Sequence, residues 1–275
     1  MVNYILITRP LNLLITLLST AAGYWLAGGS DLLTMLLTGF SASLIAAGGN
    51  VINDIYDIET DKINRPLRAL PSGKISLSAA FNYYLLLTSG GIIISVFIGY
   101  LVFTVAFSVF AGLWFYAKTL KRLPLAGNFA IALFTGLVFP YGALAAGDIS
   151  AGFFPFLFAF LTTLIREVLK DLEDINGDKA TGARTLPILY GEQNGKLFVR
   201  ISVGILFLTT LLPFILEVYK IEFFIITMIV VNPLAALAEK TSWQNSRGSA
   251  GYRKASIYMK LSMITGLIAI AAGKL

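Results

Sequence analysis

The stretch "LIAAGGNVINDIYDIETDK" (residues 44–62) joins an apolar run to four acidic side chains, and a lysine follows them at once. The acids are Asp54, Asp57, Glu59 and Asp61. Clustered charge at the end of an apolar segment is costly unless it is paired or faces water or a polar ligand. The stretch therefore predicts an apolar helix that ends in a cluster of acids and requires positive charge to neutralise them.

The rest of the chain is also strongly apolar. Its 275 residues are 57% hydrophobic and 13% charged, with a mean hydropathy of +0.79. A soluble domain of this length needs more charge to cover its surface. Because about 20 apolar residues cross the ~30 Å hydrocarbon core of a bilayer, the runs predict an all-α, polytopic membrane protein. Nine spans are expected, at residues 10–29, 32–53, 77–97, 99–117, 125–146, 152–171, 198–218, 221–239 and 256–273.

Two features of the composition restrict the chemistry. The chain contains neither cysteine nor histidine, which excludes thiol nucleophiles, Cys/His zinc sites and imidazole acid–base catalysis. The first apolar run continues to about Gly28 without a convincing cleavage site, so it is not expected to be a cleaved signal peptide. Ionic chemistry must therefore use carboxylates, amines, guanidinium groups, hydroxyls or amides.

Lysine and arginine alternate between the loops. They follow the second, fourth, sixth and eighth expected spans, whereas the intervening loops are nearly free of them. The positive-inside rule then predicts a multi-pass protein of the cell membrane with a cytoplasmic N-terminus, cytoplasmic basic loops and an external C-terminus. The net charge of +6 reflects this sidedness and is not evidence for nucleic acid. The basic face would also favour anionic lipid headgroups and phosphorylated substrates.

The acidic motif has a second copy 117 residues later in the chain. Each copy has the spacing i, i+3, i+7, a trailing lysine and then an RxLP sequence, and Asn50 of the first aligns with Glu167 of the second. The two triads are Asp54, Asp57, Asp61 and Asp171, Asp174, Asp178. The repeat predicts one transmembrane domain (residues 1–275) with two related four-helix halves, about 8–122 and 123–240, and a final helix at about 256–273.

Each motif is expected to present its polar side chains on one helix face. At about 100° per residue, positions i−4, i, i+3 and i+7 fall within about 60° of arc if the helix continues that far. Asn176-Gly177 is expected to fray the second helix, which would put Asp178 in a loop. Glu59 and Glu173 point elsewhere and are expected to be solvated or paired with basic neighbours.

Acids that share a face need a compensating cation. With only oxygen ligands available, the physical candidate is Mg²⁺, which holds few protein carboxylates and completes its shell with water and substrate phosphates. The expected substrate therefore carries a diphosphate.

The segments "NVINDIYDIETDKINRP" (residues 50–66), "YAKTLKRLPLAGN" (116–128) and "REVLKDLEDINGDKATGARTLP" (166–187) resemble those of the UbiA superfamily of intramembrane prenyltransferases. The resemblance implies nine helices around a central cavity, a side portal to the lipid, and an Mg²⁺-bound prenyl diphosphate under a cytoplasmic cap. Both acidic motifs look most like those of digeranylgeranylglyceryl phosphate synthases, which attach a second geranylgeranyl chain to a glycerol phosphate ether in archaeal-type lipid synthesis.

The motifs and the resemblance together give a candidate site. The expected ligands are Asn50, Asp54, Asp57 and Asp61 for one Mg²⁺, and Asp171, Asp174 and Asp178 for the other. Candidate diphosphate ligands are Lys62, Arg65, Arg68, Lys118, Lys121, Arg122, Lys179 and Arg184; each could instead be an ordinary residue of a cytoplasmic loop. Arg9 and Asn12 are expected near the polar head of the acceptor, and Tyr116 and Asn128 in the pocket, with membrane-boundary anchoring as the alternative for Arg9 and Tyr116. Glu167 could pair with Arg166, join the metal ligands or accept the proton of the glycerol hydroxyl.

Three alternative functions stay open. The acceptor could be an aromatic ring, as in quinone or chlorophyll synthesis. A CDP-alcohol phosphotransferase also uses intramembrane aspartates, but its pattern needs a DG…AR element between closely spaced aspartates of one motif. A cation transporter would suit paired acidic motifs, but here the acids are expected at cytoplasmic helix ends and not at the membrane midplane.

Overall fold

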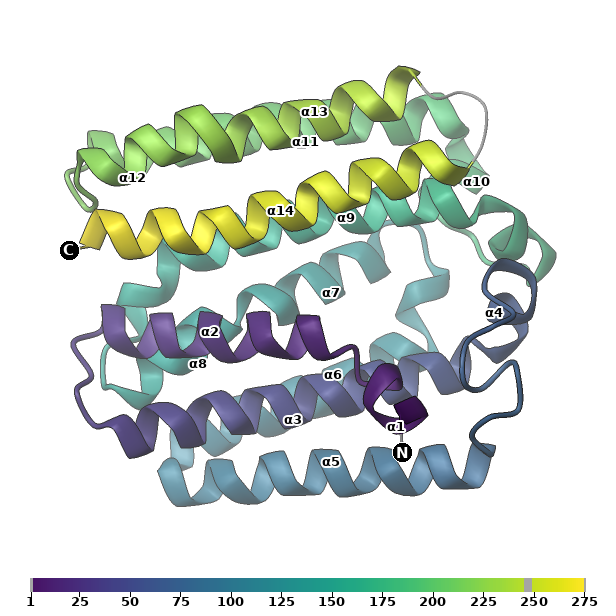
Figure 1. Cartoon of the computed structure of the whole chain (residues 1–275), viewed down its shortest axis with the longest axis horizontal. Helices are drawn as coiled ribbons and strands as arrows, with labels where there is room; N and C mark the ends of the chain where they lie inside the picture. Colours follow the sequence, from purple (N-terminus) through teal and green to yellow (C-terminus); the bar gives the residue numbers. More distant parts are fainter. Residues whose placement is uncertain (1, 245–248, 275) are drawn as a thin grey trace. The chain divides into compact units, whose positions relative to one another are not determined.

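The computed structural model describes residues 2–244 and 249–274, and all regular structure in those ranges is helical (Figure 1). The N-terminal elements are α1 (Val2–Ile7), α2 (Pro10–Leu26), α3 (Leu32–Tyr56), α4 (Ile58–Asn64), α5 (Leu77–Ile98), α6 (Tyr100–Lys118), η1 (Leu120–Arg122), α7 (Ala126–Gly136), α8 (Val138–Ala145) and η2 (Ile149–Gly152). The remaining elements are α9 (Phe153–Ala180), α10 (Leu186–Tyr190), α11 (Glu192–Ile215), α12 (Ile221–Ile226), η3 (Thr227–Val231), α13 (Asn232–Gln244) and α14 (Ser249–Lys274).

Most of these helices have the length and the apolar composition of membrane-spanning segments. Within the described ranges, eight helical segments are long and apolar enough to cross one, with α7–α8, η2–α9 and α12–α13 each counted as a single segment. The helix α2 is apolar but shorter, and it occupies the position of the first expected span. With α2 included, the described helices match the nine expected spans. The prediction of an all-α, multi-pass membrane protein is confirmed.

The chain divides into two compact units. Unit 1 consists of residues 1–121, 137–153 and 180–182, and unit 2 of residues 122–136, 154–179 and 183–275. These units do not coincide with the expected halves 8–122 and 123–240, because α8 belongs to unit 1 and α14 to unit 2. The duplication of four-helix halves stays a prediction.

The helix α3 is central to unit 1 and carries the first acidic motif at its C-terminal end. It packs against α2, α5 and α6. Gly91 of α5 lets the backbones approach, since a Cβ there would lie 2.8 Å from the carbonyl oxygen of Ser41. The Ser41 hydroxyl donates to the Gly91 carbonyl (2.8 Å) and bonds to the Tyr141 hydroxyl (2.7 Å). Polar contacts of this kind hold helices together where apolar contact alone gives little advantage over lipid.

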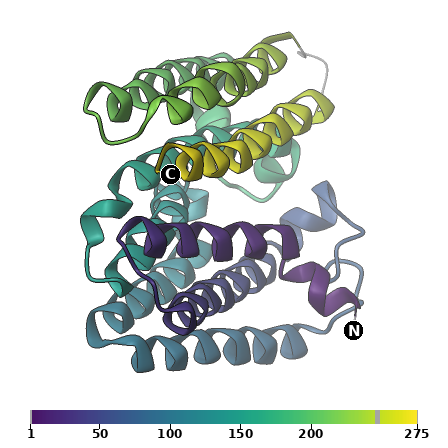
Figure 2. The same cartoon turned by 60° about the vertical axis from the view of Figure 1, so that its left-hand side comes forward.

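Unit 2 is built on α9, α11, α13 and α14. Ile165 and Val168 of α9 share a fully buried cluster with Ala255 and Met259 of α14, and α13 lies beside α14 (Figures 1 and 2). The segment from α12 to α13 includes the π-helical turn η3. Pro233 follows it and cannot donate a backbone hydrogen bond. The Ser262 hydroxyl of α14 donates to the nearby Val231 carbonyl (3.1 Å), which fixes this irregular turn against α14.

Two expectations about the motif helices need correction. The second helix does not fray at Asn176-Gly177: α9 continues to Ala180, so Asp178 is helical. A glycine costs about 1 kcal/mol in a helix, which does not end a long helix whose apolar face is buried. The first motif does not lie on one continuous helix, because α3 ends at Tyr56 and α4 begins at Ile58, with Asp57 between them.

Close packing of α2 against α8 gives a test of the fold of unit 1. A Cβ on Gly142 would lie 2.0 Å from the Thr20 carbonyl oxygen, so Gly142→Ala must push the helices apart. We expect a destabilisation of about 1–3 kcal/mol, measured as a lower Tm in detergent micelles. The control is Gly204→Ala in α11, where a Cβ meets no atom within 4 Å and alanine favours the helix. Equal Tm shifts for both variants would contradict the packing described here.

Candidate active site

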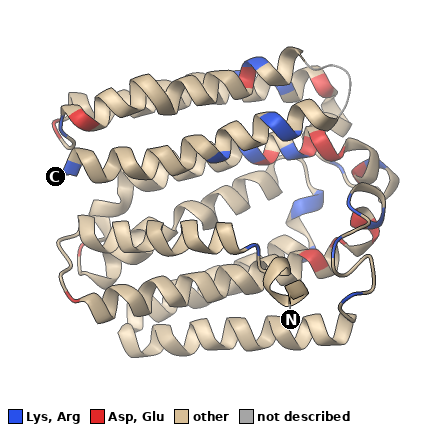
Figure 3. Cartoon of the chain, in the orientation of Figure 1, with Lys and Arg blue, Asp and Glu red and all other residues tan. Residues whose placement is uncertain are grey.

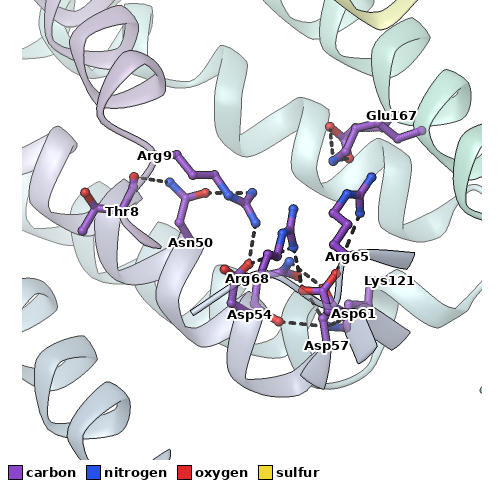
Figure 4. Close-up of polar contacts among 12 residues, drawn as sticks. Thr8, Arg9, Asn50, Asp54, Asp57, Asp61, Arg65, Arg68, Lys121 and Glu167 are labelled. Atoms are coloured by element: carbon purple, nitrogen blue, oxygen red, sulfur yellow. Dashed lines mark hydrogen bonds and ion pairs between the residues drawn. The ribbon is translucent and has the colours of Figure 1, made fainter. Parts of the chain in front are cut away.

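Charged residues of unit 1 collect at the C-terminal end of α3 and around α4 (Figures 3 and 4). Asn50 and Asp54 come from the last turns of α3, and Asp61 from α4. Asp54 is 7% exposed and Asp61 2%. Carboxylates this well buried are stable only when positive charge or hydrogen bonds compensate them. Three arginines from two segments, Arg9, Arg65 and Arg68, supply that compensation.

Arg9 reaches the motif from the junction of α1 and α2. Its guanidinium donates to Asp54 Oδ1 (2.5 Å) and to Asn50 Oδ1 (3.2 Å) (Figure 4). The Asn50 amide in turn donates to the Thr8 carbonyl (2.9 Å), which ties the same junction to α3. Arg9 has φ of 58°, a left-handed conformation that costs a non-glycine residue roughly 1–2 kcal/mol. The contacts with Asp54 and Asn50 offset this strain.

Arg68 bridges two of the aspartates. Its Nη1 lies 2.6 Å from Asp61 Oδ2 and 3.5 Å from Asp54 Oδ1, and Arg65 lies 3.8 Å from Asp61 Oδ1. Burial raises the pKa of Asp61, and the charge and hydrogen bond of Arg68 act in the opposite direction. Arg68 thus holds together the two helices that the break at Asp57 separates.

Asp57 has its own partners. The Lys121 ammonium, directly after α6, lies 2.7 Å from Asp57 Oδ1, and the Asn53 amide donates to Asp57 Oδ2 (2.7 Å). Glu59 points away and pairs with Lys62 at 2.7 Å, and both side chains are more than half exposed. The expectation that Glu59 is solvated or paired is confirmed.

In unit 2, α9 carries the whole second motif on one continuous helix. The Asn128 amide of α7 donates to Asp171 Oδ2 (2.8 Å). Glu167, one turn earlier, is 7% exposed and contacts two cations: Arg166 Nη1 at 3.2 Å, and Lys170 Nζ at 3.0 and 2.8 Å from its two oxygens. Glu173 pairs with Arg253 at 3.0 Å, as expected for an acid that points elsewhere.

The other candidate residues lie around these groups. Lys118 is stacked on the Trp114 ring, with Nζ 4.7 Å from its centre. The Arg122 carbonyl accepts the Arg184 amide (3.0 Å), so both belong to one loop pair of unit 2. Lys179 is exposed in the last turn of α9. Asn12 is in the first turn of α2, and Tyr116 packs on the apolar cluster beneath α3.

Sequence reasoning missed three participants. Asn53 is not among the expected site residues, although it lies four residues before Asp57, which is the helical spacing of the hydrogen bond that the two side chains form. Arg166 is expected only as a partner of Glu167, and Lys170 is not among the expected site residues. Their signal was present, because two basic residues flank a glutamate at i−1 and i+3 inside an otherwise apolar helix.

The ligand set suits a hard divalent cation. It offers carboxylate and amide oxygens, which are the ligands that Mg²⁺ prefers. Among the described residues, no three acidic side chains lie close enough together to hold a metal ion. The acids of the first motif are instead held by Arg9, Arg68 and Lys121. Metal binding at that motif would require these cations to change partners.

Comparison with known proteins agrees with the helices and motifs. The profile of the UbiA prenyltransferase family matches residues 16–264. The chain belongs to the UbiA prenyltransferase family. It is a membrane-embedded enzyme of that family, and the resemblance of its motifs is confirmed at the family level.

Individual relatives cover nearly the same length. The digeranylgeranylglyceryl phosphate synthase of Sulfolobus acidocaldarius is 40% identical over 237 residues, 85% of this chain and 83% of that protein. A solved structure of a digeranylgeranylglyceryl phosphate synthase is 33% identical, with a TM-score of 0.77 over 99% of this chain and 97% of that one. A UbiA homologue from Archaeoglobus fulgidus, solved with DMAPP and Mg²⁺, shares the fold with a TM-score of 0.69 at 20% identity, over 98% of this chain and 99% of that one.

The bridge made by Arg68 can be tested by a double-mutant cycle with Asp61. Arg68→Gln removes the close partner of a buried carboxylate, which we expect to destabilise the protein by roughly 1–3 kcal/mol. Asp61→Asn in the same background should recover part of that loss, because the uncompensated charge is gone. Unfolding is followed in detergent micelles.

The matched control for this cycle is Lys62→Gln, since Lys62 belongs to the exposed pair with Glu59. A surface pair of this kind contributes at most about 1 kcal/mol. Strictly additive effects of Arg68→Gln and Asp61→Asn would show that the bridge does not stabilise the protein.

Proposed function

We propose that this UbiA-family enzyme transfers a geranylgeranyl group from geranylgeranyl diphosphate to geranylgeranylglyceryl phosphate in archaeal-type ether lipid synthesis. The observation that carries the proposal is the likeness, over almost the full length of both chains, to a solved digeranylgeranylglyceryl phosphate synthase. The curated relative from Sulfolobus acidocaldarius carries the same name. Two oxygen-rich motifs, one at the end of each motif helix, supply the chemistry that an allylic diphosphate needs.

The reaction is a substitution at an allylic carbon. The bond from that carbon to the diphosphate oxygen breaks, and the diphosphate leaves with the electron pair. The hydroxyl oxygen of the acceptor forms the new ether bond, and its proton passes to a base. Charge that grows on the leaving group must be stabilised, which is the main task of the site.

We propose Mg²⁺ as the cofactor, held by each motif separately. Asn50, Asp54, Asp57 and Asp61 would provide oxygen ligands in unit 1, and Asp171, Asp174 and Asp178 in unit 2. Bound Mg²⁺ would neutralise the charge of the diphosphate as it leaves. The DMAPP- and Mg²⁺-bound homologue from Archaeoglobus fulgidus supports a divalent ion with an allylic substrate in this fold.

The cations that hold the aspartates have a second role in this proposal. Arg9, Arg68 and Lys121 each contact a carboxylate of the first motif. When those carboxylates turn to metal ligation, the cations become available to the oxygens of the diphosphate. Arginine offers a bidentate fork for such oxygens and lysine a point charge. This exchange avoids an uncompensated charge in an apolar environment. Lys62, Arg65, Lys118, Arg122, Lys179 and Arg184 remain candidates for further contacts.

Glu167 is our candidate for the base that accepts the hydroxyl proton. It is a buried carboxylate one helical turn from Asp171. Both of its oxygens accept hydrogen bonds from cations in this structure, so it can take a proton only after those cations move. Arg9, Asn12 and Tyr116 in unit 1, and Asn128 in unit 2, are further candidates for polar contacts with the substrates.

We also propose an orientation in the membrane. The loops that carry the motifs are rich in lysine and arginine, and the opposite loops are nearly free of them. This asymmetry supports a cytoplasmic N-terminus and cytoplasmic motif loops, with the C-terminus outside.

The metal assignment is tested by neutral variants of the acids. We expect Asp54→Asn and Asp171→Asn to lower Mg²⁺-dependent transfer at least about 100-fold, because each removes a ligand charge without changing the size of the side chain. The control is Glu59→Gln, an exposed acid of the same segment, which should stay within about twofold of the wild type. Wild-type turnover in both aspartate variants would exclude the assigned ligands.

The acceptor is tested with the purified enzyme, Mg²⁺ and labelled geranylgeranyl diphosphate. We expect labelled product with geranylgeranylglyceryl phosphate and none with hydroxybenzoate or a naphthoate. Product formed only with an aromatic acceptor would overturn the ether-lipid function and leave prenyl transfer itself intact.

A further inference from the structure

The helix α9 carries a second polar group that the acidic motif does not include. Thr163, Arg166, Glu167 and Lys170 have the spacing i, i+3, i+4, i+7, so they share one face of the helix. Arg166 and Lys170 both contact Glu167, at 3.2 Å and 2.8 Å. Two cations thus flank one buried carboxylate within an apolar helix.

Two hydrogen-bond donors on this face have no partner in the described part of the chain. They are the Thr163 hydroxyl and the Arg166 Nε, and both atoms are buried. Thr163 as a whole is only 4% exposed. Buried donors are nearly always bonded to protein, water or a ligand. These two donors, one of them on Arg166 itself, lie on the same helix face as the Lys170 ammonium, and together they indicate a ligand that has several acceptor oxygens.

The charges on this face also point to an anion. Arg166 and Lys170 contribute two positive charges and Glu167 one negative charge. Asp171, one turn further, is bonded to the neutral amide of Asn128 and is assigned above to the metal. When the charge of Asp171 is counted with the proposed Mg²⁺, one positive charge remains on this face, and residual charge inside a membrane helix is costly unless a partner neutralises it.

We propose that Arg166, Lys170 and Thr163 form the binding site for the phosphate monoester of the lipid acceptor. This inference rests on the proposed function, because it supposes a phosphorylated glycerol acceptor. The guanidinium fork and the ammonium are strong donors to phosphate oxygens, and the hydroxyl adds a neutral one. The acceptor phosphate replaces the Glu167 carboxylate as the partner of the two cations. Binding of the acceptor then frees Glu167 to receive the hydroxyl proton.

The test compares acceptors with and without the phosphate. Transfer is measured with geranylgeranylglyceryl phosphate and with geranylgeranylglycerol, for the wild type, Arg166→Gln and Lys170→Gln in phosphatidylcholine nanodiscs. We expect the wild type to prefer the phosphorylated acceptor at least about tenfold in kcat/KM, and each variant to lose most of this preference. The KM for geranylgeranyl diphosphate should stay within about twofold. A purely structural role for either cation would not change the ratio between acceptors.

The matched control is Arg253→Gln. Arg253 also pairs with a glutamate of α9, but Glu173 lies two helical turns beyond Arg166, and Arg253 is 64% exposed. This variant should keep the preference for the phosphorylated acceptor. Arg166→Lys keeps the charge and should restore part of the preference lost in Arg166→Gln, which separates loss of binding from loss of folding.

Three results would overturn the proposal. An unchanged acceptor preference in Arg166→Gln and Lys170→Gln, with an active wild type, removes the phosphate site and leaves the proposed function standing. Competition by phosphatidic acid as strong as that of the acceptor itself would make this a general headgroup site. A wild type that uses neither glycerol acceptor overturns the proposed function, and the inference with it.

Discussion

Neutralisation of carboxylates at the ends of apolar helices is the constraint on which the described site depends. Asp54 and Asp61 are almost fully buried, and a buried charge without a partner destabilises a protein by several kcal/mol. In unit 1, the cations that contact the motif aspartates come from three separate segments: Arg9 before α2, Arg65 and Arg68 after α4, and Lys121 after α6. The left-handed backbone of Arg9 is one local cost of this arrangement.

The two acidic motifs differ in helix geometry and in the partners of their aspartates. In unit 1 the helix breaks at Asp57, and the short helix α4 carries Asp61, with Arg68 bridging the break. In unit 2, α9 runs unbroken to Ala180, and Asp171 accepts a hydrogen bond from the neutral amide of Asn128. The cations of α9 instead flank Glu167, the residue that replaces Asn50 in the second copy. This difference favours separate roles, with diphosphate partners in unit 1 and acceptor partners on α9.

Much of the fold was predictable, because bilayer thickness sets the length of an apolar helix. The starts of α2, α3, α5 and α9 fall within a residue of the expected spans. The ends of the motif helices were not predictable. At Asp57 a helix and a turn are both allowed by local preference, and contacts with Lys121 and Asn53 favour the turn. At Gly177 the helix continues, because burial of the apolar neighbours stabilises it by more than the glycine destabilises it.

For the site, spacing alone identified the acids but not their partners. The i, i+3, i+7 pattern identifies the aspartates as candidate metal ligands. It leaves out Glu59 and Glu173, and in the structure these two acids pair with Lys62 and Arg253. No pattern shows that Arg9, 45 residues before Asp54 in the chain, lies 2.5 Å from it. Contacts of this kind depend on how α2 and α3 pack. Arg166 and Lys170 do have a local sequence signal, since they flank Glu167 at i−1 and i+3, but the repeated aspartate pattern does not include them.

Metal affinity with and without the diphosphate tests the central claim most directly. If cations of the protein occupy the aspartates until the substrate arrives, Mn²⁺ used as a probe for Mg²⁺ should bind weakly to the enzyme alone. Geranylgeranyl diphosphate should then raise the affinity of the enzyme for Mn²⁺ at least about tenfold. The affinity should also exceed that of Mn²⁺ for the free diphosphate. Both are measured by electron paramagnetic resonance in nanodiscs. Equal Mn²⁺ affinity in the presence and absence of the diphosphate would contradict the exchange of partners on which this account is built.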